Sequence, residues 1–299
     1  MHTVDPIELE LTLPQGIMAG QYWRIGTVNK TSPVCVALHG WLDNCASFAV
    51  MAQYLNELLL EQRAGLQLYC IDFAGHGHSF HRPPGVNYNI WDYAIDILHL
   101  TQQLDLKKFL LLGHSMGAGI APLIAAIVPK QVTGLVLIEG LGPLTGESDT
   151  AVLQLIRWWE REQQGVHPAR LYHSLTQAVE IRMRGRWPLT RKSAELLVKR
   201  SIRECDGGFC WRSDRRLTLP SSLYLQELQV EHFLQAVEAP VDLVMASEGL
   251  IANHTLWLHR ADKVDDIKIH QLEGSHHLHL DTAAQYCSLL IQKQLRQSY

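Results

Sequence analysis

Residues 110–119, LLLGHSMGAG, are the most informative stretch of this chain. Ser115 stands between Gly113 and Gly117, after an apolar run and before a small-residue helical stretch that begins at Met116. The pattern G-x-S-x-G in such a strand–turn–helix setting makes a sharp turn that lifts the serine hydroxyl above the edge of a sheet. Glycines are needed there because neighbouring backbone approaches too closely for side chains. We therefore predict that Ser115 is a nucleophile and that the backbone N–H of Met116 helps to hold a developing oxyanion.

Short apolar runs alternate with amphipathic stretches on both sides of this turn. Residues 7–13, IELELTL, alternate apolar and polar side chains and predict an antiparallel hairpin with residues 17–25. Buried strands are predicted at residues 33–40, 66–73, 109–115, 133–141, 239–247 and 266–274, and helices at residues 47–63, 89–106, 116–128 and 282–296. Ser47 is the expected N-cap of the first helix. The predicted class is α/β, with a mostly parallel sheet covered by helices on both faces and an N-terminal antiparallel hairpin.

The alternation of strands and helices stops at about residue 142 and resumes at residue 239. Residues 143–238 have a mostly helical pattern and are rich in Trp and Arg. We predict one core, made of residues 1–142 and 239–299, with residues 143–238 inserted as a helical cap or lid. The basic run at residues 182–191, RMRGRWPLTR, is interpreted as a solvated helix end.

Two further groups complete the expected chemistry. The first apolar strand ends in His39-Gly40-Trp41, so the backbone N–H of Trp41 is the expected second oxyanion donor. The loop after the last strand carries GSHHLHL, and His276 is the expected general base, while His277 and His279 would pack or hydrogen-bond nearby. A zinc site is disfavoured because adjacent residues do not easily converge on one tetrahedral ion, so we expect no metal and no organic cofactor.

The order of the motifs resembles that of the α/β-hydrolase superfamily over essentially the full length: LHGWLDN, IDFAGHGHS, LGHSMGAG, LVLIEGLGP and LEGSHHLHLD. Within it the chain is most similar to the serine hydrolase-like group, on the segments HGWLDNCASF, HRPPG, IEGLGPLT and WRSDRRL. The resemblance implies the α/β-hydrolase fold and a Ser–His–acid triad. Asp72, which ends the run LYCIDF, is expected to order the loop that follows it rather than to take part in catalysis.

The acid of that triad departs from the usual pattern. The superfamily usually places an Asp after the penultimate strand, where this chain has Gly249, with Glu248 one position earlier. A variant of the superfamily, as in haloalkane dehalogenases, takes the acid from the end of the preceding strand, and here that residue is Glu139. A carboxylate at the end of an apolar strand needs a partner, and an imidazole is a suitable one. Glu139 is therefore the predicted acid and Glu248 the alternative.

These residues predict a serine hydrolase that cleaves a small-molecule carboxylic ester through an acyl-enzyme. A thioesterase, a lactonase or a carbon–carbon bond hydrolase would use the same triad, and a ligand-binding protein could keep the fold with little turnover. A dehalogenase or an epoxide hydrolase is disfavoured, because the members of those families that the chain resembles have Asp where this chain has Ser115.

Composition and charge limit the expected partners and location of the protein. The net charge of −4 argues against a nucleic-acid partner, and no apolar run reaches the ~18 residues that a membrane span needs. The N-terminus has no signal-peptide pattern, so a cytoplasmic location is expected. Six cysteines are too few for a disulfide scaffold, and all six are predicted to be reduced thiols. We expect a monomer or a homodimer.

Overall fold

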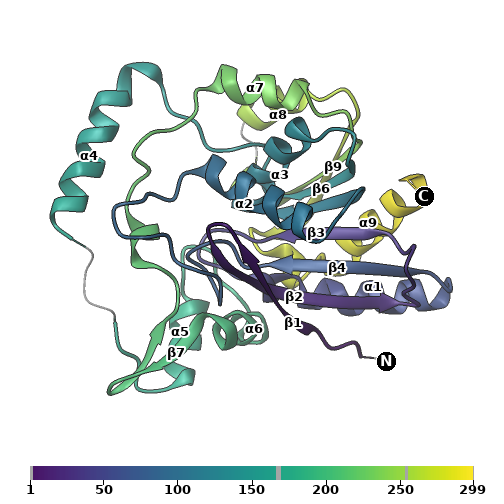
Figure 1. The fold of residues 1–299 in the computed structure, drawn as a ribbon, viewed down its shortest axis with the longest axis horizontal. Coiled ribbons are helices and arrows are strands. Elements are labelled where there is room, and N and C mark those ends of the chain that lie inside the picture. Colours follow the sequence, from purple (N-terminus) through teal and green to yellow (C-terminus); the bar gives the residue numbers. More distant parts are fainter. Residues whose placement is uncertain (1–2, 166–169, 253–254, 299) are drawn as a thin grey trace.

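The structure is a computed structural model that describes residues 3–165, 170–252 and 255–298. Eight strands form one sheet in the order β1-β2-β4-β3-β5-β6-β9-β10 (Figure 1). The strand β2 pairs antiparallel with β1 and β4, and the remaining pairs are parallel. The strands are β1 (Ile7–Leu13), β2 (Gly16–Gly26), β3 (Val34–Leu38), β4 (Gly65–Ile71), β5 (Phe109–His114), β6 (Val132–Ile138), β9 (Val241–Glu248) and β10 (Ile267–Ser275).

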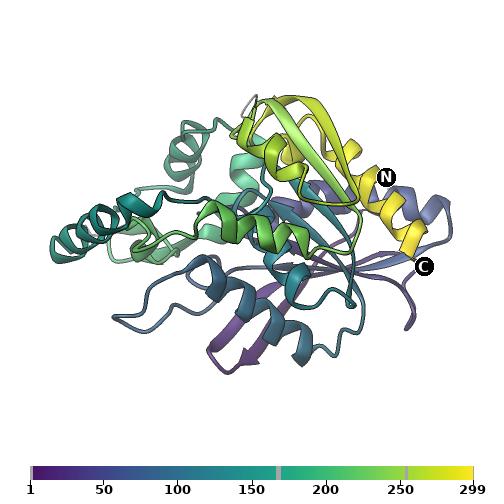
Figure 2. The same cartoon turned by 90° about the horizontal axis from the view of Figure 1, so that it is seen from above.

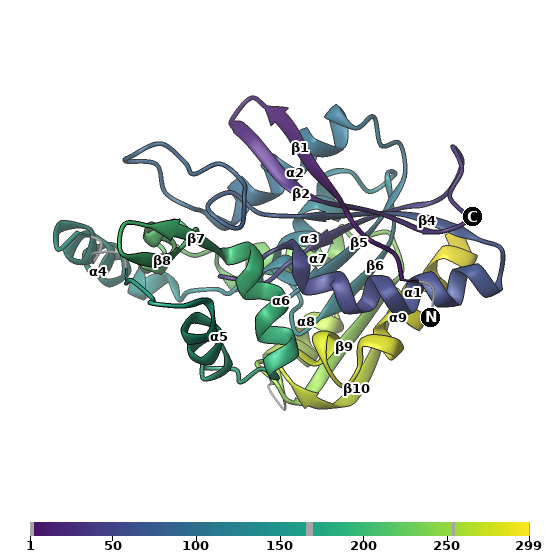
Figure 3. The same ribbon diagram turned by 90° about the horizontal axis from the view of Figure 1, so that it is seen from below.

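Helices cover both faces of this sheet. One face carries α1 (Ala49–Glu61) and α9 (Ala284–Ser298), which lie side by side in Figure 3. The other face carries α2 (Ile90–Gln103), α3 (Met116–Ile127), α7 (Glu227–Gln235) and α8 (Thr255–Ala261). Along β5, Leu110 and Leu112 join the core cluster under α1 and α9, whereas Phe109 and Leu111 join the opposite one. This alternation is why the buried strands are continuously apolar, and the predicted fold class is confirmed.

The start of the first helix differs from the prediction. A short 3₁₀ turn, Cys45–Phe48, precedes α1, and the side chain of Asn44 caps it by accepting from the N–H of Ala46. Ser47 is fully buried instead, and its hydroxyl lies 2.8 Å from Nε2 of His279. The prediction that Ser47 caps this helix is therefore wrong, because its hydroxyl contacts His279 from a distant part of the chain.

The segment between β6 and β9 is mostly helical, with α4 (Ala151–Gln163), α5 (Leu175–Met183) and α6 (Arg191–Ser201) ahead of α7. In Figures 1 and 2, α4 extends away from the sheet, and it has no buried residue. By contrast, α7 packs Val230 and Leu234 into the core cluster of the sheet. The division into a core and a cap of residues 143–238 stays a prediction.

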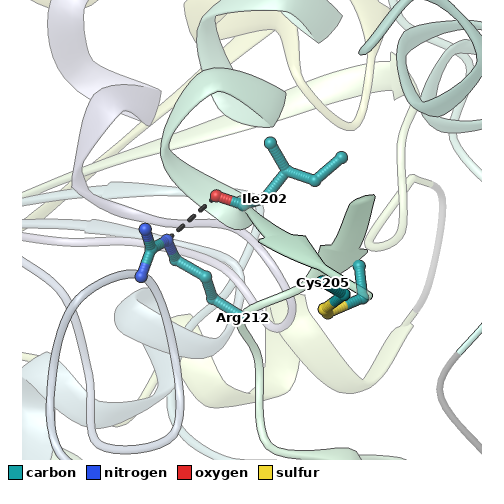
Figure 4. The surroundings of a disulfide bond; sticks show 4 residues. Ile202, Cys205 and Arg212 are labelled. Atoms are coloured by element: carbon teal, nitrogen blue, oxygen red, sulfur yellow. Dashed lines mark hydrogen bonds between the residues drawn. A yellow bond between two sulfur atoms is a disulfide. The ribbon is translucent and has the colours of Figure 1, made fainter. Parts of the chain in front are cut away.

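The same segment contains a two-stranded hairpin that its pattern did not indicate. β7 (Ile202–Cys205) pairs antiparallel with β8 (Gly208–Trp211), and a disulfide joins Cys205 to Cys210 (Figure 4). Arg212 adds a hydrogen bond of 2.9 Å from its Nε to the carbonyl of Ile202. The prediction that all six cysteines are reduced is thus wrong for this pair, because the hairpin brings the two Cα atoms to 6.1 Å, within reach of a disulfide.

The other four cysteines are buried free thiols. Within the described ranges, no helix is both long enough and apolar enough to cross a membrane.

Candidate active site

Ser115 lies at the turn between β5 and α3, with φ 52° and ψ −111°. Non-glycine residues rarely adopt a positive φ, so the surrounding packing must hold this conformation. The turn is tight: a Cβ on Gly117 would lie 1.9 Å from the carbonyl oxygen of Leu38. The N–H of Gly117 donates to the carbonyl of His39 over 3.1 Å, which fixes the end of β3 against the start of α3. The half-buried Ser115 thus occupies the place that the motif predicts for a nucleophile.

The imidazole of His276 follows β10 and is 4% exposed. Its Nδ1 lies 3.1 Å from Oε2 of Glu139. A carboxylate accepts hydrogen bonds, so Nδ1 carries the proton and Nε2 is left as the basic nitrogen. The ring of Trp187, from the link between α5 and α6, contacts the imidazole with ring centroids 5.1 Å apart.

Glu139 is fully buried immediately after β6, with a positive φ of 58°. Its Oε1 accepts from the N–H of Ala246 at 2.7 Å, and Oε2 accepts from the N–H of Leu250 at 2.5 Å. Together with the contact to His276, these bonds satisfy a charge whose burial would otherwise be costly. The side chain is therefore fixed in position as well as paired.

The alternative acid does not reach this cluster. Glu248 is exposed at the end of β9, and the described contacts of His276 include Glu139 and not Glu248. Beside it, a Cβ on Gly249 would lie 2.0 Å from Oε2 of Glu139. A side chain at the usual acid position would therefore collide with the carboxylate that this chain takes from β6.

The described contacts contain no hydrogen bond between the Ser115 hydroxyl and the ring of His276. His114, the residue before Ser115, does contact His276. Its Nε2 lies 2.9 Å from the backbone carbonyl of His276. The turn that carries Ser115 and the loop that carries His276, which we call the base loop, are thus joined directly.

Trp41 and Met116, whose backbone N–H groups are the predicted oxyanion donors, are among the residues that line a cavity of about 330 Å³. Met116 is the first residue of α3, and the first N–H groups of a helix have no partner within it. The Trp41 indole is half exposed and donates from Nε1 to the carbonyl of Leu217 over 3.1 Å. Tyr88 and Trp158 also line this cavity, whereas Ser115 and His276 are not among its described lining residues.

Asp72 orders the loop that follows it, as the sequence predicts. It is fully buried, and its carboxylate accepts from the N–H groups of Cys45 at 2.8 Å and His78 at 2.9 Å. Arg200 of α6 completes its environment with an ion pair of 2.8 Å. The side chain therefore ties the loop after β4 to the loop after β3.

Asp43, which is 3% exposed in the loop after β3, was not predicted from the sequence. Its carboxylate pairs with Arg182 and His277. Arg182 begins the basic run that was expected to be solvated, and the expectation is wrong for this residue because α5 turns it inward. Nothing in the local charge pattern indicates the contact, since the three residues come from separate segments.

Asp43, His114 and His277 offer ligand atoms that all lie within 4.8 Å of one another, a spacing that a metal ion could use. However, Nη2 of Arg182 lies 2.5 Å from Asp43 and 3.5 Å from Nε2 of His277. A guanidinium in that place competes with a cation, so these residues fit an ion-pair network better than a metal centre. The absence of a metal from the reaction stays a prediction.

Comparison with known proteins gives consistent matches. Residues 33–174 match a family model described as alpha/beta hydrolase fold. A serine hydrolase-like protein of Danio rerio is 30% identical over 294 residues, covering 95% of this chain and 86% of the relative. A serine hydrolase-like protein of Dictyostelium discoideum is 29% identical, covering 93% and 79%.

Solved structures agree with these matches. A hypothetical protein from Pseudomonas aeruginosa PAO1 is 39% identical, with a TM-score of 0.83 and coverage of 97% of this chain and 96% of the other. The thioesterase domain from the curacin biosynthetic pathway is 24% identical, with a TM-score of 0.79 and coverage of 96% and 99%. At that identity the second likeness concerns the fold alone.

Proposed function

Since the chain belongs to the serine hydrolase-like group of the α/β-hydrolase superfamily, we propose that it hydrolyses carboxylic esters through an acyl-enzyme on Ser115. The observation that supports the proposal is the buried His276–Glu139 pair, whose base is hydrogen-bonded through its backbone to His114, the residue before a serine in a strained turn. Nucleophile, base and acid in this arrangement are what acyl transfer requires.

The reaction follows from the roles of the three side chains. Nε2 of His276 accepts the proton of the Ser115 hydroxyl as its oxygen attacks the ester carbonyl carbon, and the Glu139 carboxylate stabilises the resulting imidazolium. The backbone N–H groups of Trp41 and Met116 stabilise the oxyanion. The imidazolium then protonates the departing alcohol, and a water molecule deprotonated by the same nitrogen releases the acid and regenerates Ser115.

We assign the substrate to the cavity beside the oxyanion donors. Its volume of about 330 Å³ suits a small molecule. Trp41, Tyr88 and Trp158 supply an aromatic lining, and Trp158 comes from α4 in the proposed cap of residues 143–238. The cap therefore contributes to substrate selection, and the acyl or alcohol part that enters the cavity is expected to be apolar.

The decisive experiment combines labelling with turnover. Wild type, Ser115→Ala and the exposed control Ser148→Ala are treated with a fluorophosphonate probe and assayed on p-nitrophenyl esters of graded acyl length. Wild type and the control should be labelled and active, while Ser115→Ala should lose the label and at least about 10³-fold in kcat. Turnover by Ser115→Ala at the wild-type rate would overturn the proposal.

The same panel addresses the other chemistries that share this triad. Thioesters, lactones and a vinylogous diketone are added as substrates, and the highest kcat/KM identifies the bond that is cleaved. Failure of every substrate, with no label on Ser115 but tight binding of an apolar ligand, would instead favour a binding protein with the hydrolase fold.

A cytoplasmic location and a monomeric or homodimeric state remain part of the proposal. Disulfides are rare in reducing compartments, so the pair Cys205–Cys210 makes the location testable. Alkylation of the thiols in intact cells tests this: free thiols at both positions would support a cytoplasmic protein that forms the bond only after isolation, and a disulfide already present in the cell would contradict that location.

A further inference from the structure

We propose that Asp43 is a positioning residue for His276, and that its carboxylate joins α5, the loop after β3 and the base loop into one unit. The proposal rests on the proposed function and deepens it, because it makes the orientation of the base depend on how α5 docks onto the core. Arg182, His277 and His114 are the other members of this unit, which we call the Asp43 cluster.

Both oxygens of Asp43 are engaged by different parts of the chain. Oδ1 accepts from Nη2 of Arg182 on α5 at 2.5 Å. Oδ2 lies 3.1 Å from Nε2 of His277, which must donate because a carboxylate accepts. The side chains of Asp43 and His277 are 1% and 5% exposed, so these are interior contacts. The ring next to the base is therefore fixed by a charge in the loop that also carries Trp41.

His114 fixes the backbone of the base from the opposite direction. Its Nε2 lies 2.9 Å from the carbonyl oxygen of His276, so that nitrogen carries a proton and donates. His114 is fully buried, and the residue after it is the nucleophile. One side chain thus links the nucleophile turn to the base, and His277 links the base to Asp43.

The charges in the cluster depend on one another. Burial alone would raise the pKa of Asp43, but His277 and Arg182 hold that pKa well below its usual range. Burial, together with the neighbouring histidine rings, holds the pKa of His114 well below its usual value. His114 is therefore neutral, and its Nδ1 lies 3.8 Å from Oδ2 of Asp43 without a hydrogen-bond partner in the described chain. The aspartate keeps its charge because His277 and Arg182 both contact it.

Removing the charge of Asp43 and removing the charge of Arg182 should shift the protonation of His276 in opposite directions. Without the Asp43 charge, the positive Arg182 is uncompensated next to the base loop and disfavours protonation of His276. Without Arg182, the Asp43 carboxylate has only His277 as its partner, and its negative charge adds to that of Glu139, which faces His276, so protonation of His276 is favoured. A role confined to packing would lower stability in both cases and would shift no titration.

The test compares Asp43→Asn and Arg182→Met with Arg191→Met. Arg191 is a matched control from the same segment, with 52% of its side chain exposed and its carboxylate neighbours 3.9 and 4.0 Å away. The pH dependence of kcat is measured on the best ester for each folded variant, with labelling of Ser115 as the measure of active enzyme. We expect kcat to fall about 10–100-fold for Asp43→Asn, with KM changed less than about threefold.

In the pH profile of kcat, the acidic limb should move to lower pH in Asp43→Asn and to higher pH in Arg182→Met. It should stay unchanged in Arg191→Met. Because the two groups act as a unit, the double variant should lose less than the product of the two single losses. Folded variants with wild-type kcat and unshifted limbs would overturn the inference. If Asp43→Asn does not fold, the limb shift in Arg182→Met alone decides it.

The outcome for Ser115 keeps the two proposals separate. Loss of activity in Ser115→Ala with no effect in the Asp43 cluster would refute only this inference. Full activity in Ser115→Ala would refute the proposed function, whatever the cluster variants show.

Discussion

Glu139 and Gly249 share one place in the molecule, although 110 positions separate them in the chain. The Glu139 carboxylate lies where a side chain at position 249 would project, and it makes the contact to His276. The ends of β6 and β9 are neighbours in the sheet, so either strand can present an acid to the same imidazole. Gly249 therefore leaves room for the carboxylate that this chain takes from the end of β6.

The first prediction concerns the two candidate acids. Glu139→Gln should lower kcat about 10⁴-fold, because an amide cannot stabilise the imidazolium and favours the wrong tautomer of His276. Glu248→Gln should stay within twofold of wild type, since its side chain is exposed. Steady-state kinetics on one ester, with thermal melting as a check of folding, compare them. Equal losses in both variants would contradict the assignment.

A second prediction uses the shared space directly. Glu139→Ala leaves a vacancy beside His276, and adding Gly249→Asp should supply a carboxylate to it from β9. We expect the double variant to recover at least about tenfold in kcat over Glu139→Ala, one decade being about 1.4 kcal/mol of transition-state stabilisation. Gly249→Asp alone should melt at a lower temperature than wild type, because two carboxylates would compete for one site. No recovery in the double variant would argue against spatial equivalence.

A third prediction concerns acid stability. Burial, with the nearby His39, lowers the pKa of His76 to about 3, and its Nε2 accepts from the N–H of Leu42 over 3.1 Å. The unfolded chain binds this proton near the ordinary value of about 6.5, so stability is present above that pH and is lost as pH falls toward 3.

Melting temperatures between pH 7.5 and 4 should therefore fall steeply in wild type. His76→Gln should be less stable at neutral pH and show a shallower decline, because the variant removes one group that must take up a proton on unfolding. Parallel declines in the two proteins would show that His76 does not contribute.

A fourth prediction concerns the thiols. Titration with Ellman's reagent in guanidinium should find four thiols, from Cys35, Cys45, Cys70 and Cys287, and six after reduction. Replacing Cys205 and Cys210 together by serine should lower the free energy of unfolding by about 2 kcal/mol, since the closed loop is short. Six thiols before reduction would contradict the disulfide.

Local patterns predicted the order and type of the strands and helices of the main sheet, and they indicated Ser115, His276 and two candidate acids, Glu139 and Glu248. Apolar periodicity, turn glycines and motif order are properties of residues close together in the chain, and parallel strands end at a common edge. The two candidate acids could not be separated from residues alone, because that requires knowing which carboxylate faces the imidazole.

The remaining features depend on contacts between distant segments. Ser47 contacts His279 instead of capping the first helix, Arg182 forms an ion pair with Asp43, and Cys205 is bonded to Cys210 across a hairpin. In each case the side chain could also be satisfied locally or by water, and the packing of other elements brought it to the partner that it has. Such choices are made by the folded chain as a whole, because burial fixes which partners remain within reach.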